Sequence, residues 1–257
     1  MPHWSGPARQ QDYNFFEQSK SLMAILSGLG GRALGIITAP RATFEAVARS
    51  PRWVGIMVVT FLVAAAATAI VLSTDVGQLA LLDQWERTAS AFGRQLTDAE
   101  YARLAEASRN GAGYAVISTL ASGPLLAIGL SAALFLAFRT TAPGAVTFRQ
   151  VLAVVAHAGV ILALRQLVAA PVAYATETLA SPITMGTFFR MLDEVSPIAR
   201  FFSIVDLFVV WWIFVLAIGM SVLYRRPARR LAGVFVGAYV TLAIVLTAVM
   251  AATGGTV

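Results

Sequence analysis

The sequence predicts an all-α membrane protein: a polytopic bundle of five transmembrane helices, with an N-terminal interfacial helical segment and a small external helical cap. Of the 257 residues, 58% are hydrophobic and 12% charged, and the mean hydropathy is +0.74; such values are typical of polytopic membrane proteins. Five apolar runs are each long enough to cross a hydrocarbon core, which takes roughly 20 helical residues. Helices are favoured over barrel strands because the runs are continuous and do not alternate with polar residues.

The predicted spans divide the chain into a cytoplasmic tail with interfacial helices, 1–52, and a membrane domain, 53–252. External segments are expected at 73–113 and 176–202. The spans themselves are predicted at about 53–72, 114–138, 150–175, 203–224 and 231–252.

The distribution of arginine and lysine predicts the orientation of the spans. Flanks on the side of the amino terminus carry 12 of these residues, and flanks on the opposite side carry 6. Because lysine and arginine resist translocation, this bias predicts a cytoplasmic amino terminus and an external carboxyl terminus in the inner, cytoplasmic membrane. The start of the chain lacks the features of a cleaved secretion signal, so we expect it to remain on the mature protein.

The region before the first span predicts two interfacial helices. The stretch TAPRATFEAVARSPRW indicates a short helix that begins at Pro40 and ends before Pro51, with Phe44 and Val47 on one side. We expect this helix to lie on the inner membrane surface. The semi-apolar stretch 14–37 indicates an interfacial or docking helix interrupted by glycines.

The first external segment predicts the helical cap. Thr97 and Glu100 have the spacing of a capping box, and Leu96 with Tyr101 has the spacing of a hydrophobic staple. The second external segment contains Pro182 and semi-apolar residues, and we expect it to lie on the membrane surface or pack on the cap.

Composition excludes several functional classes. The chain has no cysteine and only two histidines, which are far apart in sequence, so neither a metal site nor another cofactor is expected. Arginines lie between apolar runs rather than in a soluble basic patch, which argues against nucleic-acid binding despite the net charge of +6. Nucleotide, GxSxG and HExxH motifs are absent from the sequence, so we predict no catalytic residues and no enzyme.

Three ionisable residues fall within the predicted spans: His157, Arg165 and Asp206. A charged side chain at mid-membrane costs about 2.5–3.5 kcal/mol on insertion scales, so each charge is expected to have a partner. Arg165 and Asp206 fall at similar depths, and we predict a structural ion pair between them, with Glu177 as the competing partner for Arg165. The alternative is a functional relay that joins His157, Arg165 and Asp206, and the other candidates for an intramembrane polar site are His157 and Glu177.

A ridge of small residues on the last span indicates close helix packing. Gly233, Gly237 and Thr241 recur at four-residue spacing, which is the GxxxG type of pattern. We favour packing inside one bundle over a dimer face.

Three stretches resemble one family in the order that the family has them. The stretch VDLFVVWWIFVLAIGMSVLYRR resembles the fourth span of bacterial members of the Yip domain family, five-span membrane proteins related to Rab/Ypt-interacting proteins. ITAPRATFEAVARSP and TFRQVLAVVAHAG resemble the segment before the first span and the entry to the third. The residues that carry the resemblance are Pro40, Phe44, Phe148, Asp206, Phe208, Trp211 and Gly219. The resemblance implies a cytoplasmic amino terminus and supplies no catalytic residues; we do not carry over the Rab-related role of the eukaryotic branch.

The leading functional hypothesis is a non-enzymatic inner-membrane protein that acts as an accessory, adaptor or organising subunit. Its expected partners are the lipid bilayer and either another membrane protein or further copies of itself. The alternative is a small solute or lipid transporter, or a component of a permease. An intramembrane hydrolase would need a nucleophile facing His157, which the sequence does not indicate.

Overall fold

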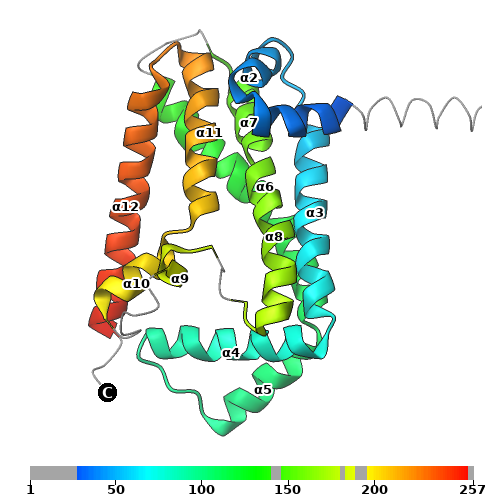
Figure 1. The fold of residues 1–257 in the computed structure, drawn as a ribbon, viewed down its shortest axis with the longest axis vertical. Helices are drawn as coiled ribbons and strands as arrows, with labels where there is room; N and C mark the ends of the chain where they lie inside the picture. Colours follow the sequence, from blue (N-terminus) through cyan, green and yellow to red (C-terminus); the bar gives the residue numbers. More distant parts are fainter. Residues whose placement is uncertain (1–27, 140–145, 180–182, 189–195, 254–257) are drawn as a thin grey trace, which may run out of the picture.

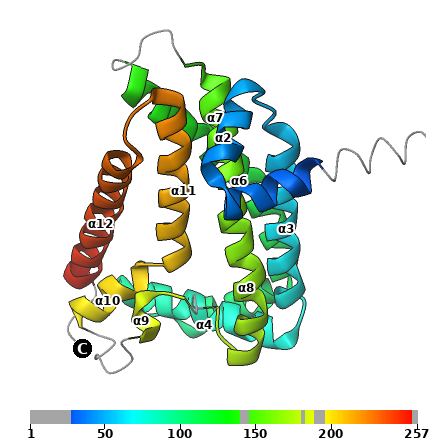
Figure 2. The same ribbon diagram turned by 45° about the horizontal axis from the view of Figure 1, so that its top comes forward.

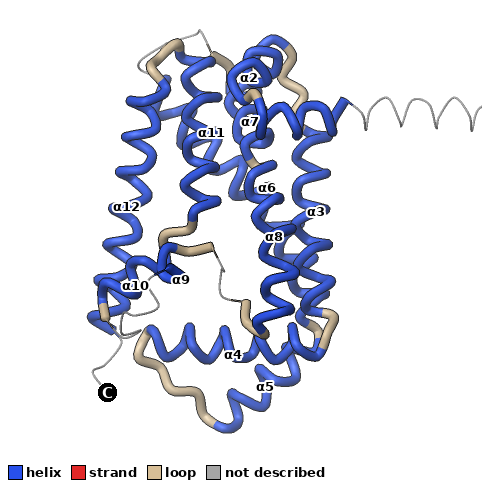
Figure 3. Tube along the Cα trace, in the orientation of Figure 1, coloured by secondary structure: helices blue, strands red, loops and turns tan. Residues whose placement is uncertain are grey.

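The computed structural model describes residues 28–139, 146–179, 183–188 and 196–253. Within these ranges the chain is helical except for loops and one isolated β-bridge, between Thr184 and Asp206 (Figure 3). Five of the helical segments are long and apolar enough to cross a membrane. The predicted fold class, an all-α bundle with five membrane-length helices, is therefore confirmed.

The five spans run side by side and connect in alternating directions (Figures 1 and 2). The turn between the last two spans lies at the same end of the bundle as the helix α2, and the carboxyl-terminal end of the last span lies at the other end, beside α4 (Figure 1). The spans are α3 (Val54–Leu72), α6 (Gly111–Arg139), α7 (Phe148–Ala158) with α8 (Val160–Thr176), α11 (Leu207–Tyr224) and α12 (Ala228–Thr253).

Two spans differ from their predicted form. The fourth begins at Leu207 rather than at residue 203, because the chain is extended at Val205 and Asp206 and the preceding residues form a separate helix, α10 (Pro197–Ile204). The third span is divided at Gly159 into α7 and α8, although Gly159 keeps right-handed helical backbone angles and the two helices form one apolar segment, Phe148–Thr176. Apolar residues continue across both interruptions, so hydropathy alone gives no sign of either.

The segment before the first span is helical, as predicted, but its glycines do not interrupt it and its second helix packs against the bundle. Residues 28–38 form a helix that continues through its glycines, so the expected interruption there is wrong; the rest of the 14–37 stretch lies outside the described residues. The helix α2 (Pro40–Arg49) begins at Pro40 as expected. However, its Phe44 and Val47 are buried, at 0% and 1% exposure, because α2 packs against α7 and α11 instead of lying only on a membrane surface.

A pair of helices crosses the opposite end of the bundle (Figure 1). These are α4 (Asp75–Ala91) and α5 (Asp98–Arg109), and α5 begins with the predicted capping box between Thr97 and Glu100. The Thr97 backbone N–H and the Arg94 guanidinium, which both donate to the Glu100 carboxylate, lower the pKa of Glu100 to about 2. The short helices α9 (Met185–Phe188) and α10 also lie at this end.

The apolar core lies towards the α2 end and is centred on α7. Every residue of α7 from Val151 to Ala158 is buried, and the core cluster adds residues from α2, α3 and the carboxyl-terminal half of α11. Apolar packing therefore joins the spans at one end of the bundle, whereas towards the α4 end polar contacts also join them.

Candidate functional site

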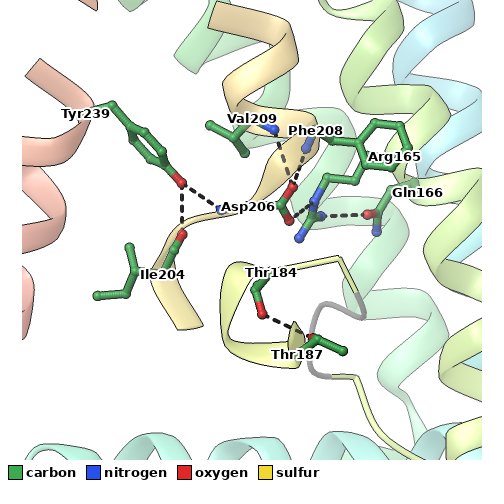
Figure 4. A network of polar contacts seen from close by, with 9 residues as sticks. All are labelled: Arg165, Gln166, Thr184, Thr187, Ile204, Asp206, Phe208, Val209 and Tyr239. Atoms are coloured by element: carbon green, nitrogen blue, oxygen red, sulfur yellow. Dashed lines mark hydrogen bonds and ion pairs between the residues drawn. The ribbon is translucent and has the colours of Figure 1, made fainter. Parts of the chain in front are cut away.

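Asp206 caps the amino terminus of α11 and is the centre of a polar network (Figure 4). Its Oδ1 accepts hydrogen bonds from the backbone N–H groups of Phe208, at 2.8 Å, and Val209, at 3.3 Å. These groups belong to the first turn of α11, where backbone donors have no partner within the helix. Asp206 is therefore placed where a carboxylate is favoured by both the free N–H groups and the helix dipole.

Arg165 of α8 pairs with the other oxygen of this carboxylate. Its Nε donates to Asp206 Oδ2 at 2.7 Å, and the two side chains are 29% and 6% exposed respectively. The structure thus brings together the two residues of the predicted pair. Glu177, the competing partner, is exposed and follows the last residue of α8, roughly 18 Å along the helix from Arg165.

The network continues from α8 to α3 through Gln166. Arg165 Nη1 donates to Gln166 Oε1 at 3.0 Å, and Gln166 Nε2 donates to Thr68 Oγ1 at 2.8 Å. The Thr68 hydroxyl in turn donates to the carbonyl of Ala64 at 3.1 Å. These contacts satisfy the polar groups of neighbouring spans at the same depth, as a low-dielectric environment requires.

On the other side of Asp206, Tyr239 links the network to α12. The Tyr239 hydroxyl accepts from the Asp206 backbone N–H at 3.1 Å and donates to the Ile204 carbonyl at 2.8 Å (Figure 4). It thereby pairs both backbone groups at the extended break between α10 and α11. Side chains from α3, α8, α11 and α12 consequently form one connected set of hydrogen bonds.

A short backbone pairing reinforces the same break. Leu207 N–H donates to the Ile183 carbonyl at 3.1 Å, and Met185 N–H donates to the Val205 carbonyl at 2.8 Å. Residues of the segment before α9 therefore hold the chain extended on both sides of Asp206, which leaves its carboxylate directed at Arg165 (Figure 4).

His157 lies outside this network. It is fully buried in α7, and its Nδ1 is 2.7 Å from the carbonyl oxygen of Ala153. Its Nε2 is buried without a hydrogen-bond partner among the described residues. The described hydrogen bonds do not connect His157 with Arg165 or Asp206, and the described residues contain no group of three or more potential metal ligands.

The small-residue ridge on α12 faces away from the bundle. Gly233, Gly237 and Thr241 are exposed, and a Cβ atom added at either glycine would have no described atom within 4 Å. The expectation that this ridge packs inside one bundle is therefore wrong. Helix α12 packs on α11 and α10 through other residues, such as the buried Ala243 and Thr247.

The residues that carry the family resemblance lie mainly at contacts between elements. A Cβ atom at Gly219 would be 2.5 Å from a methyl carbon of Val154 and 3.1 Å from the Phe44 ring, so α2 and α7 approach α11 closely at this glycine. Phe148 packs edge-to-face against Phe135. Pro40 occupies the start of α2, Asp206 caps α11, and the Phe208 and Trp211 rings are 5.8 Å apart.

Sequence reasoning from hydropathy found the charged pair but missed Thr68, Gln166 and Tyr239. Polar uncharged residues and tyrosines are common in membrane helices, and their spacing here gives no distinctive pattern. The capping role of Asp206 did have a signal, since an aspartate directly before an apolar helical run is a typical N-cap.

Comparisons with known proteins agree with this architecture. Searches of curated proteins and of solved structures found no match. A model of the Yip1 domain matches residues 34–250, which include all the helices described above from α2 to α11 and most of α12. With five helices that are long and apolar enough to cross a membrane, the chain is a multi-pass membrane protein and belongs to the Yip1 domain family.

Proposed function

We propose that this protein is a non-enzymatic accessory, adaptor or organising subunit of a membrane assembly, and that it binds the transmembrane helix of a partner on α12. In this proposal the α2 end faces the cytoplasm and the protein resides in the inner membrane, a topology supported by the excess of arginine and lysine at that end. The partner is another membrane protein or a second copy of this chain.

The observation that carries the proposal is the open face of α12. Only 11% of the most apolar 18-residue stretch of α12 is buried within the chain, against 33% for α3, 44% for α11 and 61% for the third span; α6, at 6%, is also open. The exposed face contains Gly233, Gly237 and Thr241, with Val234 and Ile244 beside them.

Lipid tails are as apolar as leucine, so burial of apolar surface gives little driving force for helix association in a bilayer. Association depends instead on close packing of backbones, which small residues at four-residue spacing permit. On α12 no described helix of the chain packs against the two glycines of this pattern. The Thr241 hydroxyl donates to the Gly237 carbonyl and so does not project outward unpaired. The ridge is therefore open at both glycines and its threonine hydroxyl is already paired, so a second helix can approach this part of the α12 backbone closely.

The proposal is tested with Gly237→Ile and the matched control Ala238→Ile. Both residues are exposed on α12, but only the first lies on the ridge. Tagged and untagged copies are coexpressed, extracted in mild detergent, and measured for copurification and mass. Loss of a stoichiometric complex in Gly237→Ile, with retention in Ala238→Ile, supports the proposal; equal retention in both variants, or a monomer without partner in the native chain, contradicts it.

A small solute or lipid transporter is the second candidate, and one observation favours it. A cavity of about 470 Å³ lies between α3, α6, α7, α8 and α11 and contains Arg165 and Gln166 in its wall. Transport can be measured with liposomes that contain the purified protein and a fluorescent phosphatidylcholine, by reduction of the label from outside. If a larger fraction of the label is reduced than in protein-free liposomes, the result supports transport of lipid. If the fraction and rate of label reduction are the same in both, the result contradicts transport of lipid.

A further inference from the structure

We propose that the cavity between α3, α6, α7, α8 and α11 is a binding site for one acyl amphiphile, which enters sideways from the membrane with its head at Arg165 and its chain along α3. The cavity and the α12 ridge lie on different sides of α11. The inference therefore does not depend on the proposed adaptor role.

The dimensions of the cavity match an acyl chain. Its volume of about 470 Å³ falls within the range of roughly 300–1,000 Å³ that is common for ligand sites. On α3 the lining extends from Met57 to Thr68, a distance of about 16 Å along the helix. That distance is close to half of a hydrocarbon core of about 30 Å, which is the depth of one leaflet.

The two ends of the cavity differ in polarity. At the end nearer α2 the lining is mainly apolar and includes Met57, Leu130 and Val155; the Thr60 hydroxyl there donates to the Met57 carbonyl. At the other end it includes Thr68, Arg165 and Gln166, which are joined by hydrogen bonds. A ligand that fits both ends has a long apolar chain and a head that accepts hydrogen bonds, such as a phosphate or a carboxylate.

The wall contains a second hydrogen-bond donor at another depth. Trp212 lines the cavity, and its indole Nε1 is buried without a partner among the described residues. It lies about 9 Å farther along α11 than Asp206, the residue that holds Arg165. A buried N–H that lacks an acceptor is unfavourable, and an ester or carboxyl oxygen of a bound amphiphile would supply one.

The cavity is accessible from the lipid phase. Leu126 of α6 lines it and is nevertheless 71% exposed, so the opening is at the side of the bundle. By contrast, Ala156 and Ala163 line its inner wall and are only 4% and 7% exposed. Lipids that merely surround the protein cannot reach these two alanines, whereas a chain inside the cavity contacts them.

The test uses two photoactivatable probes with a diazirine on the acyl chain: a phosphatidylcholine and a free fatty acid. Each is added to the full-length protein in nanodiscs of phosphatidylcholine, irradiated, and the adducts are mapped by mass spectrometry. We expect adducts at Ala156 and Ala163 with at least one probe; the probe that labels them identifies the source of the chain. Labelling confined to exposed residues with both probes overturns the proposal.

Two variants test whether the labelled site is this cavity. Ala127→Phe fills it from α6, and Ala133→Phe, on an exposed position of the same helix, is the matched control. Leu126→Trp obstructs the mouth at an exposed position where folding tolerates a larger side chain. In Ala127→Phe and Leu126→Trp we expect labelling of the inner-wall alanines to fall to the level seen without irradiation, whereas the control retains it. Unchanged labelling in Leu126→Trp and in folded Ala127→Phe overturns the proposal.

Discussion

Removal of the negative charge of Asp206 tests whether the polar network stabilises the bundle. Asp206→Asn keeps an oxygen that can accept from the first-turn amides of α11 but removes the charge facing Arg165. A hydrogen bond to a charged group contributes about 1.5–3 kcal/mol. In this variant the Arg165 side chain is 29% exposed and can keep its hydrogen bond to Gln166. We therefore expect Asp206→Asn to lower the free energy of unfolding by about 2 kcal/mol.

The reciprocal change has a larger expected effect. Arg165→Gln leaves a carboxylate whose side chain is 6% exposed without Arg165 as its cationic partner, and removal of one partner from a buried ion pair costs roughly 3–5 kcal/mol. The double variant Arg165→Gln/Asp206→Asn contains two amides that can hydrogen-bond to each other. We expect it to be more stable than the sum of the single losses predicts, by roughly 0.5–3 kcal/mol.

The three variants are compared by reversible unfolding in mixed detergent micelles, followed by tryptophan fluorescence, together with the yield of folded protein. Asp83→Asn is the matched control, because Asp83 forms an exposed pair with Arg87 one turn away, and such pairs contribute at most about 1 kcal/mol. Native yield and native unfolding midpoints in both single variants, or strictly additive losses in the double variant, would refute a stabilising ion pair.

Three further changes test separate contacts. Gly219→Val should lower the free energy of unfolding by about 1–3 kcal/mol, because the added side chain overpacks the contacts with Val154 and Phe44; thermal unfolding in detergent measures this. Tyr239→Phe should cost about 1–3 kcal/mol in the same assay, since the carbonyl of Ile204 loses its donor. The pKa of Glu100 is lowered from 4.5 to about 2, so its stabilisation of α5 should be complete above pH 4.5 and lost as the pH falls to about 2; amide exchange in α5, corrected for intrinsic rates, measures the loss.

Each of these changes has a control on the same chain. Gly129→Val adds the same side chain to an exposed position of α6 where no described atom lies within 4 Å and should leave the melting temperature near that of the native protein. Tyr174→Phe removes a hydroxyl from a side chain that is 55% exposed and should have little effect. Glu100→Gln should abolish the pH dependence of α5. A control that behaves like its test variant contradicts the contact assigned to that variant.

The sequence predicts the spans well because a helix that crosses a membrane needs only roughly 20 consecutive apolar residues. It also predicts local caps, such as the one between Thr97 and Glu100, because their spacing is fixed by helix geometry. Depth along a helix is readable too, since rise per residue is constant. This is why Arg165 and Asp206 could be matched across two spans without knowledge of the packing.

Sequence reasoning fails where tertiary packing decides between local options. Pro40 and the apolar spacing of α2 indicate an amphipathic helix, but whether its buried face contacts lipid or protein depends on the close approach that Gly219 permits. The ridge at Gly233 and Gly237 has the same pattern whether it is buried in the bundle or open. The break before α11 depends on backbone pairing with Ile183 and on Tyr239, neither of which is close to it in sequence.

The hydrogen bonds that run from Thr68 through Gln166 and Arg165 to the Asp206 carboxylate, and from the Asp206 backbone N–H to Tyr239, limit how these helices can move. Sliding any one of these four spans along its axis by a single turn, about 5.4 Å, would separate at least one donor from its acceptor within an apolar surrounding. The network therefore opposes sliding of these spans along their axes. Tilting of the spans about the layer that contains the network changes the donor–acceptor distances least. Relative movement of these four spans should therefore occur mainly as tilting about this layer, with the larger displacements at the two ends of the helices.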